Sequence, residues 1–263
     1  MKADDLHKLA ADSRFIPGIY NYCDRWCERC SLSNRCMNFA MQQAEGYGDL
    51  TARDLSNQKF WDRLQQSYHA AVEMLRTEAK ARGVDLDDPK LRLAAEARIQ
   101  AEHRQTSKNQ PVVRAAMAYA KAVDRWLGEA RPLLEAKLEE LKTEVVLEIG
   151  DPQAEVMQLT DFTEIIKWYQ YFIFVKLRRA VDSQASEELP PAGGRSPKDS
   201  DGSAKIALIG LDRSIAAWSG LRTALGADEA DGILDLLAQL AALRRETEKL
   251  FPNARAFVRP GFD

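Results

Sequence analysis

Residues 23–36 read CDRWCERCSLSNRC and contain all four cysteines of the 263-residue chain. The spacing is C-x3-C-x2-C-x5-C, which places four thiols in one short segment. In a compartment that keeps thiols reduced, cysteines clustered in this way are typical of metal ligands or redox thiols, whereas structural disulfides are rare. We therefore predict that Cys23, Cys27, Cys30 and Cys36 bind one metal centre. Four free thiols or two disulfides are the alternative.

The composition is that of an ordinary globular protein. Hydrophobic residues make up 45% of the chain and charged residues 29%, and 37 basic against 40 acidic residues give a net charge of −3. This balance argues against a nucleic-acid-binding protein, which usually carries a strongly basic face. Residues 1–14 contain no apolar signal-peptide core, and the apolar run at 171–175 is too short to cross a bilayer. We expect a cytoplasmic protein without a membrane segment, whose partner is another protein.

Outside the cysteine segment, apolar residues recur at the three- and four-residue steps of an amphipathic helix. The pattern predicts a helix that begins at Thr160 or Asp161, and others over residues 56–83, 87–106, 111–146, 204–225 and 228–250. Pro132 lies inside the third of these ranges and predicts a kink or break there. No alternating strand pattern of useful length is present. The predicted fold class is all-α, a multi-helix bundle with an N-terminal four-cysteine metal-binding segment.

The same patterns divide the chain into four parts. We expect a four-cysteine metal-binding segment over residues 1–48, a helical bundle over 49–186, a flexible linker over 187–203 and a helical hairpin over 204–263 that packs on the bundle. The linker is rich in Pro, Gly and Ser and contains few apolar residues. The helix that begins at Thr160 or Asp161 is apolar around most of its circumference, so we expect it to be the most buried.

The cysteine spacing bears on the kind of metal. Zinc favours four thiolates that often come from two C-x2-C pairs, and this chain has only one such pair, Cys27 and Cys30. Iron–sulfur clusters accept four cysteines at more varied intervals. We therefore favour a 4Fe-4S cluster, with zinc as the alternative.

Three arginines alternate with the cysteines. A thiolate-rich centre carries negative charge, and the guanidinium groups of Arg25, Arg29 and Arg35 would stabilise it. Trp26 would shield the centre from water. These four residues are the predicted cofactor-binding set, although exposed arginines without a role are also common. The aromatic stretch over residues 15–22 is expected to pack beneath the site.

Parts of the motif resemble known signatures. The C-x3-C-x2-C spacing of Cys23, Cys27 and Cys30 resembles that of radical-SAM enzymes, but the chain lacks the strands of their α/β barrel. The C-x2-C-x5-C spacing that ends at Cys36 resembles some iron–sulfur nucleases, but no PD-(D/E)xK motif accompanies it. Residues 15–36 as a whole resemble the N-terminal signature of a group of uncharacterised bacterial proteins, which implies no activity.

No catalytic motif accompanies the cysteines. The chain contains no P-loop, no G-x-S-x-G elbow, no H-E-x-x-H helix and no E-x-x-H pair of a di-iron bundle. Our first hypothesis is a metal-binding helical protein, either an iron–sulfur protein for redox sensing or electron transfer, or a metal-stapled protein-interaction module. The alternatives are a structural zinc-binding scaffold and, third, a metal-dependent enzyme that uses groups such as His69 and Glu73. Whether the protein is an enzyme stays open.

Overall fold

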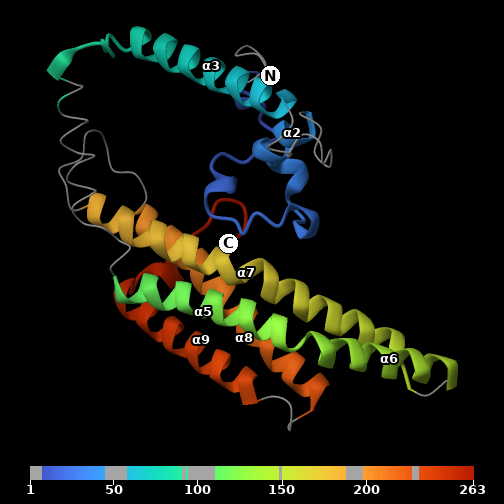
Figure 1. Cartoon of the computed structure of the whole chain (residues 1–263). Helices are drawn as coiled ribbons and strands as arrows, with labels where there is room; N and C mark the ends of the chain where they lie inside the picture. Colours follow the sequence, from blue (N-terminus) through green and yellow to red (C-terminus); the bar gives the residue numbers. More distant parts are fainter. Residues whose placement is uncertain are drawn as a thin grey trace. The chain divides into compact units, whose positions relative to one another are not determined.

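The computed structural model describes residues 8–44, 58–90, 93, 110–147, 150–187, 198–226 and 231–263. Across these ranges all regular secondary structure is helical and no strand occurs (Figure 1). This confirms the all-α prediction. None of the described helices combines the length and the hydropathy needed to span a lipid bilayer.

The chain forms two compact units. The first contains Met1–Arg104 together with Arg259–Asp263, and the second contains Gln105–Val258. This division differs from the four parts expected from the sequence, which placed a boundary after residue 48. In particular, the last five residues belong to the same unit as the cysteine segment.

The second unit is a helical bundle. Its helices are α5 (Pro111–Glu129), α6 (Arg131–Leu147), α7 (Pro152–Glu187), α8 (Asp199–Leu225) and α9 (Asp231–Leu250). Helices α5, α7, α8 and α9 pack side by side, while α6 runs along the N-terminal part of α7 (Figure 1). A short 3-10 helix, η6 (Ala254–Ala256), then packs on α8. Helices α8 and α9 therefore pack on α7 and α5.

The predicted break near Pro132 is confirmed. Helix α5 ends at Glu129 and α6 begins at Arg131, with Ala130 between them. Pro132 has no backbone N–H, so it is tolerated in the first turn of a helix, where that group lacks an intrahelical partner.

Helix α7 begins earlier than the sequence pattern predicts. Asp151 precedes the helix, and its Oδ1 accepts a hydrogen bond of 3.1 Å from the backbone N–H of Ala154. Pro152 follows as the first helical residue, a combination that favours helix initiation. The predicted start at Thr160 or Asp161 was wrong, because both residues lie inside α7.

Helix α8 begins inside the predicted linker 187–203. Asp199 at its start accepts hydrogen bonds from Arg179 Nη2 and Ser183 Oγ of α7, both at 2.6 Å. These contacts hold the first turn of α8 against α7. The turn is too polar to be recognised from hydrophobic periodicity. Residues 188–197 of the predicted linker lie outside the described residues.

The most buried helix is α8 rather than α7, which corrects the sequence-based expectation. Helix α7 leaves Tyr171 and Val175 exposed by 42% and 55%. Helix α8 contacts α7, α9 and η6, and its glycines allow close approach. A Cβ atom on Gly210 would lie 3.1 Å from Tyr169, and one on Gly220 would lie 2.3 Å from Phe162.

The core of the bundle contains a polar contact among aromatic residues. Trp218 is fully buried, and its indole N–H donates a hydrogen bond of 2.9 Å to the hydroxyl of Tyr119. The ring of Trp126 meets Trp218 edge to face at 4.8 Å between centroids. These contacts join α5 to α8.

The described part of the first unit contains the cysteine segment and one long helix. Its described elements are η1 (Ile19–Asn21), η2 (Cys27–Arg29), η3 (Ser33–Arg35), α2 (Met37–Ala44) and α3 (Gln58–Ala81). Helix α3 agrees with the prediction for residues 56–83 wherever that range is described. Most of the helix predicted over 87–106 lies outside the described residues.

Candidate metal centre

All four cysteines line one small pocket, whose cavity volume is about 20 Å³. None of the four is joined in a disulfide, and each is partly exposed to solvent. The pocket is lined by Ile19, Cys23, Asp24, Arg25, Trp26, Cys27, Cys30, Ser33, Cys36, Phe39 and Phe262. Ile19, one of these lining residues, is only 2% exposed. Part of the aromatic stretch over 15–22 therefore forms a wall of this pocket.

Two similar 3-10 turns place two of the thiols. In η2 the backbone N–H of Cys30 donates to the carbonyl of Cys27 at 3.2 Å. In η3 the N–H of Cys36 donates to the carbonyl of Ser33, also at 3.2 Å. Both turns have the sequence x-x-Arg-Cys and end on a cysteine with extended backbone. Ser33 therefore occupies in the second turn the position that Cys27 occupies in the first.

The backbone before the first turn is strained. Arg25 has φ of 61°, and it is the only described non-glycine residue with a positive φ. This left-handed conformation costs about 1–2 kcal/mol for a residue with a Cβ atom. The backbone N–H of Trp26 donates to Asp24 Oδ1 at 3.2 Å, which closes a local turn around Arg25. All three residues line the pocket.

The four predicted cofactor-binding residues have different environments. Arg25 and Trp26 line the pocket, whereas Arg29 and Arg35 are not among its lining residues. The guanidinium carbon of Arg29 lies 4.1 Å from the centroid of the Trp26 ring, so Arg29 reaches the pocket wall through that ring. The backbone carbonyl of Arg35 accepts a hydrogen bond of 3.0 Å from Ile16, which fixes the second turn against the aromatic stretch.

The thiols lie close enough to influence one another electrostatically. Burial, together with the negative charges of Cys23, Cys36, Glu28 and Cys30, raises the pKa of Cys27 to about 11. Cys27 therefore carries its proton at neutral pH unless a cation stabilises the thiolate. A bound metal ion is such a cation, because thiolate ligation displaces the proton.

The donor set of the pocket fits a thiophilic metal centre, although the thiols are not yet in ligand geometry. Within the part of the chain that the structure describes, no three His, Cys, Asp or Glu side chains are arranged to hold a metal ion. Four thiols are a donor set that selects zinc or an iron–sulfur cluster.

Sequence reasoning missed several residues of the pocket wall. Asp24 and Ser33 lie between the cysteines, and the repeated x-x-Arg-Cys sequence was a signal that could have identified Ser33. Phe39 follows the last cysteine in α2. Phe262 lies at the opposite end of the chain, and no local pattern connects it to the cysteines.

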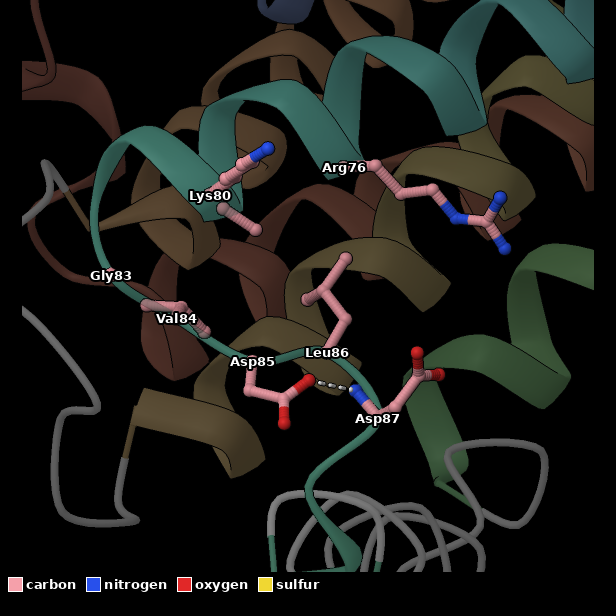
Figure 2. Close-up of a pocket in the computed structure, with 8 residues that line it drawn as sticks. Arg76, Lys80, Gly83, Val84, Asp85, Leu86 and Asp87 are labelled. Carbon is pink, nitrogen blue, oxygen red and sulfur yellow. Dashed lines mark hydrogen bonds between the residues drawn. The ribbon is translucent and has the colours of Figure 1, made fainter.

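A second depression lies at the C-terminal end of α3 (Figure 2). The basic residues Arg76 and Lys80 line it together with Asp85 and Asp87. Figure 2 shows that these side chains do not point toward a common centre, and Asp85 Oδ1 accepts a hydrogen bond of 3.0 Å from the backbone of Asp87. Because both signs of charge mix in an open depression, it selects no ligand.

Comparisons with protein-family models, with curated proteins and with solved structures find no match to this chain.

Proposed function

We propose that this protein is a metal-binding helical protein in which Cys23, Cys27, Cys30 and Cys36 hold a 4Fe-4S cluster. The observation that supports this most is that one pocket is lined by all four cysteines of the chain. When bound, such a cluster supplies one-electron redox chemistry or a response to oxidants. The resulting function is redox sensing, electron transfer or a metal-stapled interaction module.

The remaining pocket residues have roles in holding the centre. Ile19, Phe39 and Phe262 provide apolar walls that limit the access of water. Low solvent access and hydrogen bonding around sulfur are features that tune cluster potentials. Arg25 lines the pocket and contributes positive charge beside a thiolate-rich centre.

The unequal arrangement of the two turns favours the cluster over zinc. Ser33 stands where a second C-x2-C pair would need a cysteine, so the donors come from one pair and two separate positions. Structural zinc remains the second candidate, because a compact set of four thiols is also a common zinc site. Under that candidate the metal staples the first unit and the bundle acts as a scaffold.

The helical bundle is the proposed partner-binding part. Where α6 ends and α7 begins, Val146, Leu147 and Met157 are exposed by 80%, 60% and 72%. Exposed apolar side chains such as these are available for contact with a protein partner. We propose a protein partner, and no nucleic acid or membrane.

An enzyme is the less favoured candidate. His69 and Glu73 lie on α3, where both are exposed, and neither lines the pocket of the cysteines. An acid–base site needs polar groups that converge in a pocket.

A cysteine series tests the proposal. Each cysteine is changed to serine in turn, and iron, zinc and sulfide per chain are measured after anaerobic purification. Ser33→Ala is the matched control, because Ser33 lines the same pocket without contributing a thiol. We expect each cysteine variant to lose metal and the control to retain it, since removing one ligand weakens a four-thiolate site. Cysteine variants that retain the metal content of the wild type would refute the assignment.

A further inference from the structure

The last five residues form a compact turn of their own. The backbone N–H groups of Phe262 and Asp263 donate to the carbonyl of Arg259 at 3.2 and 3.4 Å. Asp263 Oδ2 accepts in return from the backbone N–H of Arg259 at 3.0 Å, and the two side chains form an ion pair of 2.7 Å. The guanidinium of Arg259 also lies 4.9 Å from the centroid of the Phe262 ring. These contacts fix the direction of Phe262.

This turn packs closely on the aromatic stretch that precedes the cysteines. Gly261 has φ of +78°, a conformation that strongly favours glycine. A Cβ atom there would lie 2.8 Å from Ile16 Cδ1 and 3.3 Å from Ile19 Cδ1. Any residue larger than glycine at position 261 would therefore have to displace the turn or these isoleucine side chains.

The packing brings Phe262 to the cysteine pocket, where it is partly buried and lines the same space as all four thiols. The other wall residues all lie between residues 19 and 39. Phe262 is thus the one lining residue that can leave the pocket without unfolding the segment that carries the cysteines.

We propose that Arg259–Asp263 form a lid on the cysteine pocket, and that opening of this lid controls the access of solvent, oxidants and thiol reagents to the four cysteines. Regulation of a bound metal by the lid rests on the proposed function, whereas shielding of the thiols does not. The lid opens by release of Phe262 from the apolar wall, which includes Ile19 and Phe39.

The test is the rate at which a maleimide reagent modifies the cysteines of the full-length protein as purified, followed by mass spectrometry. Phe262→Ala removes the ring. Gly261→Ala keeps the ring, but its Cβ would strain the positive φ and shift either the turn or the Ile16 side chain. Val258→Ala is the matched control, because Val258 directly precedes the lid, is 70% exposed and does not line the pocket. Metal content is measured on every sample, and rates are compared at equal metal content.

We expect both lid variants to accelerate modification by about five- to tenfold, and the control to stay within about twofold of the wild type, as for a local opening reaction. Phe262→Leu keeps an apolar cover and should restore most of the protection. Rates for Phe262→Ala and Gly261→Ala that equal the control would overturn the lid. Circular dichroism and hydrogen exchange of the bundle separate lid opening from global unfolding, because the bundle signals should not change.

The outcome also separates the lid from the proposed function. Absence of metal from every purified sample would contradict the metal centre and leave the thiol rates to decide on the lid. Metal in every sample with equal thiol rates would support the centre and refute the lid.

Discussion

The left-handed backbone at Arg25 leads to a prediction that separates conformation from charge. Arg25→Gly and Arg25→Ala both remove the guanidinium, but only glycine adopts a φ of 61° without a Cβ penalty. The penalty is about 1–2 kcal/mol, and the larger backbone entropy of unfolded glycine offsets roughly 0.5–1 kcal/mol of the gain. The glycine variant should therefore be more stable than the alanine variant by about 1 kcal/mol.

Local hydrogen exchange measures this difference where it acts. The amides of Cys30 and Cys36 donate within the two turns of the cysteine segment and report its opening. A difference of about 1 kcal/mol corresponds to roughly fivefold slower exchange in the glycine variant than in the alanine variant. Equal exchange, or faster exchange in the glycine variant, would refute the interpretation that Arg25 is conformationally strained.

Two further predictions concern the bundle. Gly220→Ala should lower the free energy of unfolding by about 1–3 kcal/mol, because its Cβ would lie 2.3 Å from Phe162. A Cβ atom on Gly128 in α5 would meet no atom within 4 Å, so Gly128→Ala should instead raise the free energy of unfolding by about 0.5–1 kcal/mol. Urea denaturation that changes the free energy of unfolding in the same direction for both variants would contradict the packing. Burial raises the pKa of Tyr119 to about 12, so the unfolded state loses this proton first as the pH rises above about 10. The contribution of Tyr119 to stability should therefore fall by up to about 3 kcal/mol between pH 10 and 12, and this fall should be absent from Tyr119→Phe in matched urea titrations.

Local periodicity and proline signals in the sequence predicted most of the described helices. Pro132 divides α5 from α6 because the effect of a missing N–H does not depend on distant residues. The sequence-based prediction failed at the start of α8, because Asp199 is held there by Arg179 and Ser183 of α7. The start of α7 was missed although Asp151 and a following proline are themselves a start signal.

The site shows the same limit. Four cysteines in one short segment predicted that the thiols would converge on one metal. The thiols line one pocket, but among the described residues no three ligand side chains are arranged to hold a metal ion. The strain at Arg25 and the contact of Phe262 depend on backbone conformation and on packing between distant parts of the chain, which local patterns do not encode. Gly261, which permits the close approach of the tail, looks in sequence like any other turn glycine.

The central claim is that the four cysteines hold a 4Fe-4S cluster, and the most direct measurement is an absorption spectrum with elemental analysis of anaerobically purified protein. The account predicts a brown protein with broad absorption in the blue, bleached by dithionite, and about four irons per chain. One zinc per chain without colour would contradict the cluster and leave a structural zinc site. A colourless protein that contains neither metal would contradict the metal centre itself.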